Sequence, residues 1–282
     1  MDRLLEERLF KVLMLSSLTM VVGSLFAVVA VVVLNGAPAL TPSMLTQTPK
    51  GGYYLGKEGG ILNAIIGSIY LAFGSVLLAL LISIPTALSL QRDYIKKTKV
   101  AYSIRLSLDV LWGTPSIVYG AFGFTVMLYL GMRASLLGGI IVLTLLQIPI
   151  MIRAIDETVK LVPAELKETS YALGTTRFET TFKIVIIQVL PGIATAVLLA
   201  FGRSIGDAAS ILFTAGYTDN IPGSLLDPAA SLPLAIFFQL GTPFPEVQQR
   251  AYASALVLLV IVLVVSVASR ALGQRFSKHI LR

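Results

Sequence analysis

Charged and hydroxyl side chains interrupt an apolar stretch at residues 184–215 of this 282-residue chain. Successive residues of a helix are rotated by about 100°, so side chains three or four residues apart lie on the same face. This applies here if the stretch forms one helix. Such a face is formed by Arg203, Asp207, Ser210 and Thr214. A charge near the bilayer centre costs ~2.5–3.5 kcal/mol on insertion scales, so Arg203 must face protein or water. Either an Arg203–Asp207 pair fixes helix packing, or, as we favour, the stripe lines a substrate path where Arg203 presents its donors to an oxyanion.

A second polar face is predicted within residues 107–131, which are also apolar overall. Pro115 removes a helical hydrogen bond, which predicts a kink that exposes polar backbone at membrane depth. Small residues at helical spacing also allow membrane helices to pack closely. We favour a pathway wall over simple packing, because Asp109 would otherwise need a buried partner of its own. The members of the predicted face are Asp109, Gly113, Ser116, Gly120 and Gly123.

The elements that position these residues are predicted to be membrane helices. The chain is 56% hydrophobic and 13% charged, with a mean hydropathy of +0.85, which lies outside the range of soluble domains. The first apolar run exceeds the apolar region of a typical signal peptide, so we expect it to remain as an anchor. The fold class is therefore all-α, a polytopic membrane protein with six transmembrane helices. The runs long enough to cross ~30 Å of hydrocarbon are residues 10–34, 61–90, 107–131, 134–152, 184–215 and 251–272.

The distribution of basic residues predicts the orientation. Of the 22 lysines and arginines, 17 lie in the termini and loops on one side of the predicted spans. Because cytoplasmic loops carry the excess of positive charge, both termini and the segment 153–183 are predicted to be cytoplasmic, in a multi-pass protein of the plasma membrane. Short basic loops beside membrane spans also account for the net charge of +7 without a nucleic-acid partner.

The residue types predict neither a catalytic site nor a metal site. The chain has no cysteine, a single histidine, His279, in the basic tail, and no nucleophile–base motif. The sequence from Gly51 to Glu58 is similar to the motif of a phosphate-binding loop. It departs from that motif at Glu58, where a serine or threonine must hold magnesium. We therefore expect no catalytic residue, metal or cofactor in this chain.

The polar segment 153–183 separates two apolar runs. Gly174 is predicted to end a first helix in a left-handed conformation. Thr176 and Glu179 have the spacing of a capping box, which would start a second short helix. An apolar face outside the bilayer suits docking to a partner, and the alternative is an ordinary amphipathic loop. This face is formed at i, i+4 by Phe178 and Phe182.

Several motifs resemble those of one family, the permease subunits of ABC importers. Such permeases dock into their ATPase subunits with a segment called the EAA loop. This loop is resembled by Glu168-Thr-Ser-Tyr-Ala-Leu-Gly174, followed by Leu190-Pro-Gly192. Two further segments resemble hallmarks of the phosphate-specific branch, Gly113-Thr-Pro-Ser-Ile-Val-Tyr-Gly120 and Gly202-Arg-Ser-Ile-Gly-Asp207. Phe213-Thr-Ala-Gly216 and the long loop after it are similar to the PstA subunit of this branch rather than to its PstC partner. The chain departs from the family pattern with Thr169 and Ser170 in place of alanines, and Asp207 in place of the commoner glutamate.

The resemblance implies the architecture of a type I ABC importer permease, which is MetI-like. The expected divisions are an N-terminal helix with an outer loop at 1–60, a permease core at 61–272 and a basic cytoplasmic tail at 273–282. The core would include the coupling loop 153–183. Residues expected to couple to the ATPase are Glu168, Thr169, Ser170, Gly174, Phe178 and Phe182. Residues expected to line the substrate pathway are Arg203, Asp207, Asp109, Ser116, Ser210 and Thr214.

The function implied by the resemblance is ATP-driven import of inorganic phosphate across the plasma membrane. The implied partners are a PstC-like permease subunit, forming a heterodimer, an ATPase dimer of PstB-like subunits, a PstS-like phosphate-binding protein and membrane lipid. ATP and Mg would be bound by the ATPase subunits, and this chain would be non-catalytic. Two alternatives remain open: an ABC permease for another oxyanion such as sulfate, and a proton-coupled secondary transporter. An intramembrane enzyme is less favoured, because no nucleophile–base pair is visible.

Overall fold

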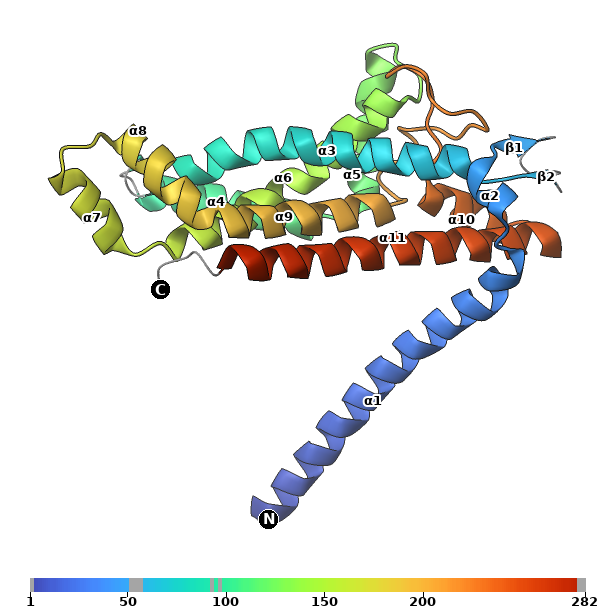
Figure 1. The fold of residues 1–282 in the computed structure, drawn as a ribbon, viewed down its shortest axis with the longest axis horizontal. Helices are drawn as coiled ribbons and strands as arrows, with labels where there is room; N and C mark the ends of the chain where they lie inside the picture. Colours follow the sequence, from blue (N-terminus) through green and yellow to red (C-terminus); the bar gives the residue numbers. More distant parts are fainter. Residues whose placement is uncertain (1–2, 51–57, 92–93, 96–97, 278–282) are drawn as a thin grey trace.

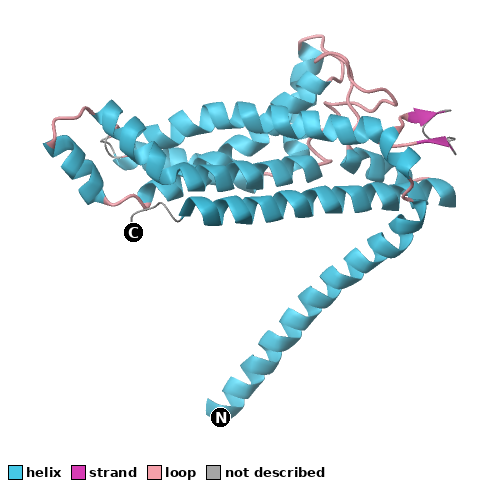
Figure 2. Cartoon of the chain, in the orientation of Figure 1, coloured by secondary structure: helices cyan, strands magenta, loops and turns pink. Residues whose placement is uncertain are grey.

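The computed structural model describes residues 3–50, 58–91, 94–95 and 98–277, which are mostly helical (Figures 1 and 2). Residues 51–57, which belong to the segment similar to a phosphate-binding motif, lie outside the described part, as does His279. The long helices are α1 (Arg3–Gly36), α3 (Leu62–Ser89), α4 (Thr98–Gly113), α5 (Ser116–Tyr129), α6 (Leu136–Lys160), α9 (Ile186–Gly206) and α11 (Pro245–Ser277).

Shorter elements connect the long helices at both ends of the molecule. At the outer end, strands β1 (Pro49–Lys50) and β2 (Glu58–Gly59) pair antiparallel, with Pro49 opposite Gly59. The remaining short elements are the turn η1 (Ala37–Ala39), α2 (Pro42–Thr46), α7 (Ala164–Ala172), α8 (Arg177–Thr180), the π-helical turn η2 (Thr181–Val185) and α10 (Leu232–Leu240).

The predicted all-α membrane fold is confirmed, but two of the predicted spans are not single straight helices. Among the described residues, five helices are long and apolar enough to cross a membrane. A sixth span results if the pair α4 and α5, bent by 95°, is counted as one. The kink expected at Pro115 is thus a full break, and Pro115 precedes α5 as its N-cap residue. The run 184–215 is interrupted as well, because α9 ends at Gly206.

The bundle is built around the contact of α3 with α6, to which α9, α4 and α5 add (Figure 1). Glycines let α3 and α6 approach closely. A Cβ at Gly74 would lie 2.7 Å from Ile140 Cδ1, and one at Gly139 would lie 2.6 Å from Leu71 Cδ2. Small residues at such crossings allow backbones to approach, which favours van der Waals packing between membrane helices.

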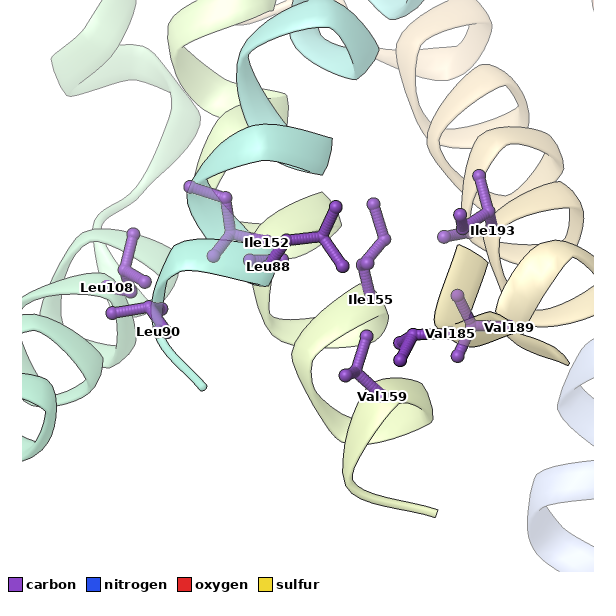
Figure 3. Packing of buried hydrophobic residues seen from close by; sticks show 11 residues of the cluster. Leu88, Leu90, Leu108, Ile152, Ile155, Val159, Val185, Val189 and Ile193 are labelled. Atoms are coloured by element: carbon purple, nitrogen blue, oxygen red, sulfur yellow. The ribbon is translucent and has the colours of Figure 1, made fainter. Parts of the chain in front are cut away.

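The cytoplasmic end of the bundle has its own apolar core, in which side chains of α3, α4, α6 and α9 meet (Figure 3). In contrast, α1 leans away from the body and meets it near α11 (Figure 1). None of the apolar window of α1 is buried within the subunit, so this helix faces lipid or another subunit. The labelled members of the core are Leu88, Leu90, Leu108, Ile152, Ile155, Val159, Val185, Val189 and Ile193.

The close approach of α3 and α6 predicts that Gly139→Val destabilises the subunit. Its side chain would overlap Leu71 and also Ala215, whose Cβ lies 2.8 Å from the Cβ position of residue 139. Overpacking of this kind costs about 1–3 kcal/mol. The midpoint of thermal unfolding in detergent should fall. Gly23→Val is the matched control, because a Cβ on this glycine of α1 meets nothing within 4 Å. Equal midpoints for the two variants would contradict the prediction.

Candidate functional site

Helix α9 ends in the middle of the bundle. The Ser204 hydroxyl accepts a hydrogen bond of 2.8 Å from Gln147 Nε2 and lies 3.2 Å from Ser75 Oγ. Ser75 and Gln147 stand near the middles of α3 and α6. The end of α9 therefore lies at mid-depth, and residues 207–231 continue without a regular helix. This is the depth at which the sequence placed Arg203.

Arg203 lies in the last turn of α9, and its side chain is exposed on the surface of the single subunit. A cation in this position interacts favourably with the negative end of the helix dipole. Within the described part of the chain, no carboxylate forms an ion pair with Arg203. The Arg203–Asp207 pair, which the sequence offered as an alternative, is therefore not formed.

Asp207 instead organises the chain after α9. Its backbone is extended (φ −82°, ψ 124°), and Oδ1 accepts hydrogen bonds of 2.9 Å from both the backbone N and the Oγ of Ser210. Aspartate commonly bonds nearby backbone donors in this way and so competes with helix continuation. The expectation that residues 203–214 form one helical stripe is wrong for this reason.

Ser210 and Thr214 are fully buried inside the subunit. Thr214 Oγ1 donates to the Ser210 carbonyl at 3.2 Å. On the neighbouring helix α5, a Cβ at Gly120 would lie 2.8 Å from the Ser210 carbonyl oxygen, so the two segments are in close contact. Both hydroxyls therefore belong to the internal packing of the isolated subunit, whereas Arg203 faces outward.

Asp109 and Ser116 lie on different helices. Because the chain turns by 95° between α4 and α5, the polar face predicted to continue from one to the other does not form. Asp109 Oδ1 lies 2.8 Å from Nε of Arg153 in α6, which provides the partner that the sequence left unidentified. Ser116 is half-buried in the first turn of α5. Asp109 therefore belongs to a charged cluster at the cytoplasmic end.

The break between α4 and α5 leaves an apolar notch of about 370 Å³ on the surface. Tyr119 belongs to its lining, and the Tyr119 hydroxyl donates to the Leu111 carbonyl at 2.8 Å. Gly120, the residue after Tyr119, packs against the Ser210 carbonyl, so the notch lies close to the chain segment that follows Arg203. The notch is lined by Leu111, Thr114, Val118, Tyr119, Phe122, Leu145, Ile148 and Pro149.

The coupling loop has the two helices expected from its sequence. Gly174 has a φ of +82°, the left-handed conformation predicted for the end of α7. The capping box is complete: Glu179 N donates to Thr176 Oγ1 at 3.3 Å, and Thr176 N donates to Glu179 Oε2 at 3.0 Å. The second helix is not independent, however. Helix α8 continues through η2 into α9, so that residues 177–206 form one span.

The outer surface of this loop is apolar. The rings of Phe178 and Phe182 lie 4.3 Å apart, and these side chains are 65% and 50% exposed. Leu173 beside them is 80% exposed. Exposed apolar groups of this kind outside a membrane span are typical of protein interaction surfaces. Glu168 and Thr169 are also exposed.

Ser170 is different, because it is buried within the loop. Its Oγ lies 2.6 Å from Thr175 Oγ1 and 2.9 Å from Thr180 Oγ1, and the two threonine hydroxyls lie 2.9 Å apart. Thr175 Oγ1 also donates to the Ser170 carbonyl at 2.8 Å. Ser170 thus joins α7 to α8 internally. Sequence reasoning missed this network, although the three hydroxyls stand at a regular spacing of five residues.

Comparisons with known proteins identify the family. Residues 79–278 match the family described as binding-protein-dependent transport system inner membrane component. The chain is 35% identical over 221 residues to the phosphate transport system permease protein PstA of Yersinia pestis, covering 78% of this chain and 74% of that protein. It is 31% identical over 268 residues to the probable ABC transporter permease protein YqgI of Bacillus subtilis, covering 88% of each. The chain belongs to this family of transport permeases.

Family membership confirms the resemblance noted from the motifs, including its PstA-type branch, and establishes a multi-pass membrane protein. Solved structures share the permease fold. A chain of the inward-facing MetNI methionine ABC transporter superposes with a TM-score of 0.62 at 17% identity, covering 77% of this chain and 95% of that one. A chain of a bacterial alginate ABC transporter gives 0.68 at 12%, covering 98% and 97%. At such identities the likeness concerns the fold alone, and it confirms the MetI-like architecture.

The hydrogen bonds of Asp207 predict that Asp207→Ala destabilises the permease more than Asp207→Asn does. Asparagine keeps an acceptor for the Ser210 donors, whereas alanine removes it. Hydrogen bonds to charged groups contribute about 1.5–3 kcal/mol, so the alanine variant should unfold at a clearly lower temperature. Thermal unfolding of the purified subunit measures the difference. Equal unfolding temperatures for the two variants would show that the carboxylate does not hold this turn.

Proposed function

We propose that this permease is the membrane subunit of an ATP-driven importer of inorganic phosphate. The observation that carries the proposal is the exposed Arg203 at mid-depth. No carboxylate of the described residues neutralises it. A charge at this depth is costly unless it meets water, protein or a counter-ion. The PstA proteins to which the chain is similar are named as phosphate transport permeases, which supports phosphate as the anion.

The chemistry of Arg203 suits an oxyanion. Its planar guanidinium offers paired donors that match two oxygens of a phosphate, and it keeps its charge at any physiological pH. Ser210 engages Oδ1 of Asp207, and no ion pair joins Asp207 to Arg203, so Arg203 remains available to the anion. Arg203 is therefore the pathway residue that we propose to contact phosphate, and Asp207 acts by shaping the chain behind it.

The face that carries Arg203 suits the second permease subunit. The apolar notch at the break of α4 and α5 lies beside the contact of α5 with Ser210, shortly after Arg203 in the chain, and contact with lipid alone would leave the arginine without a polar partner. A PstC-like subunit packed against this face would place Arg203 on an aqueous path between the two permeases. A PstS-like protein would deliver phosphate from the outer side.

The coupling loop is the proposed docking site of PstB-like ATPase subunits, which would bind ATP and Mg. Helices α7 and α8 of this loop lie at the end of the bundle opposite β1 and β2 (Figure 1). The exposed apolar residues of the loop include Leu173, Phe178 and Phe182. Because α8, η2 and α9 form one continuous span, a displacement of the docked loop reaches the end of α9 as a rigid movement. ATP-driven closure of the ATPases would then reorient Arg203 between the two sides.

The proposal predicts that Arg203→Lys lowers the rate of phosphate uptake by about tenfold or more, the effect expected from losing a charge-assisted hydrogen bond of about 1.5–3 kcal/mol. Membrane abundance should stay normal, because no intrasubunit ion pair is broken. Uptake of radiolabelled phosphate by the reconstituted complex, normalised to abundance, measures the effect. Arg133→Lys, at an exposed arginine outside the predicted path, is the control. Unchanged uptake in Arg203→Lys, or import of sulfate in place of phosphate by the wild type, would refute the proposal.

A second prediction concerns Gly174. A β-branched residue at positive φ is strained by about 1–3 kcal/mol, so Gly174→Val should disturb the loop surface and weaken ATPase binding. Gly131→Val is a matched control, since Gly131 has a φ of +69° at the other end of the molecule and, like Gly174, has open space around its Cβ position. The amount of ATPase co-purified per permease should fall in the first variant only. Equal co-purification in both would mean that the loop is a linker.

A further inference from the structure

A charged cluster at the cytoplasmic end of the bundle surrounds the buried carboxylate of Asp156. The side chain of Asp156, in the last turns of α6, is 0% exposed. Arg105 holds both of its oxygens, with Nε 2.8 Å from Oδ2 and Nη2 2.9 Å from Oδ1. Gln91 Nε2 donates to Oδ1 at 3.1 Å, and Lys160 Nζ lies 3.0 Å from Oδ2. The carboxylate is thus fully engaged by donors.

These donors come from three parts of the fold. Gln91 follows α3, Arg105 belongs to α4, and Lys160 belongs to α6 itself. Arg105 Nη2 also donates to the Leu90 carbonyl at 3.1 Å, which reinforces the link to the end of α3. A single buried carboxylate therefore connects the cytoplasmic ends of α3, α4 and α6.

Helix α4 depends on this cluster for its position. Among the described elements, its extensive packing is on α6. Leu108 and Ile104 are its contributions to the apolar core, and one turn from Arg105 the pair Asp109–Arg153 adds a second polar link to α6. The opposite side of α4 is exposed, including Leu106. Two polar links, Arg105–Asp156 and Asp109–Arg153, therefore supplement the apolar packing and orient α4 on α6.

The cluster also borders the coupling loop. A cavity of about 560 Å³ separates α4 and the end of α6 from α7. The chain passes from Lys160 to the start of α7 through only three residues, 161–163, so a displacement of α7 acts directly on the end of α6. The polar lining of the cavity includes Gln91, Arg105 and Lys160 of the cluster, and Lys167, Glu168 and Tyr171 of α7.

We propose that Asp156 is a positioning residue of the transport cycle, which transfers movement of the coupling loop from α6 to α4. Helix α4 is the cytoplasmic half of the interrupted span, and the other half, α5, packs at Gly120 against the Ser210 carbonyl of the segment that follows Arg203. The inference rests on the proposed function, because the coupling loop has a movement to transmit only when an ATPase docks on it.

The energetics of the cluster favour this role over a purely stabilising one. Among the described residues, the three carboxylates and three cations of the cluster balance. Desolvation offsets most of the Coulomb attraction of a buried ion pair, and well-packed apolar residues of similar volume are often at least as stable. What the ionic arrangement adds is orientation, since a bidentate arginine fixes both the distance and the angle between two helices. The members are Asp109, Asp156, Glu157, Arg105, Arg153 and Lys160.

The test uses the complete transporter, with both permeases, the ATPase and the binding protein, reconstituted in liposomes. Asp156→Asn removes the charge and keeps the shape. The double variant Arg105→Met, Asp156→Leu replaces the pair by apolar side chains, which leaves neither the guanidinium nor the carboxylate unpaired. Ser103→Ala is the control, because Ser103 is exposed on α4 and donates only to the Lys99 carbonyl of its own helix. Three quantities are measured: ATPase bound per permease, ATP hydrolysed per phosphate imported, and ATP hydrolysis without binding protein.

We expect both cluster variants to bind the ATPase normally. The amount of ATP hydrolysed per phosphate imported should exceed that of the wild type by about fivefold or more, which is at the lower end of the factors by which coupled sites typically affect one another. The control should match the wild type. If Asp156→Asn does not accumulate in the membrane, the ATP-to-phosphate ratio of the double variant tests the proposal. Normal abundance with a normal ATP-to-phosphate ratio in the double variant would overturn the proposal and leave the cluster as packing. Failure of the wild type to import phosphate would refute the proposed function instead, and hydrolysis without binding protein would still test Asp156.

Discussion

Backbone polar groups inside hydrocarbon must find partners within the protein, and this constraint shapes the structure where two spans are interrupted. At the first interruption, Thr114 Oγ1 donates to the Val110 carbonyl at 3.1 Å and the Tyr119 hydroxyl donates to the Leu111 carbonyl at 2.8 Å. At the second, the Asp207 carboxylate accepts from the backbone N of Ser210. Much of the polarity that stands out in the apolar sequence therefore serves to complete helix ends.

Arg203 differs from the polar residues around it in its partners. Ser204 is hydrogen-bonded to Gln147, Thr214 to a backbone carbonyl, and Asp207 to Ser210. Each has a local partner that explains its presence without a substrate. Arg203 lies at the same depth on the exposed face of the subunit, with no carboxylate partner in the described part of the chain. Arg203 alone, and not a helical stripe, therefore marks the proposed pathway on this face.

Local sequence rules predicted those features that depend on neighbouring residues. Hydropathy and basic loops gave the membrane fold, and glycine and capping preferences located the turn at Gly174 and the start of α8. The candidate site was less predictable, because its geometry depends on where helices stop. The periodicity that grouped Asp109 with Ser116 holds only while a helix continues, and the chain turns at Pro115 between them. Asp156 escaped notice because its main partner, Arg105, is distant in sequence, although Lys160 at i+4 is a local signal of an ion pair.

The coupling loop 153–183 is connected to Arg203 by two routes. One is the continuous span from α8 through α9, which ends beside Ser204. The other runs from the end of α6 through Asp156 to α4, and across the break to α5, which packs at Gly120 on the chain after α9. The hydroxyls of Ser170, Thr175 and Thr180 tie α7 to α8, so the two routes do not move independently at the cytoplasmic end. A rigid displacement of this loop would therefore act on Arg203 and on the neighbouring wall of α5 together, which changes the surroundings of a bound anion without requiring any helix to unfold.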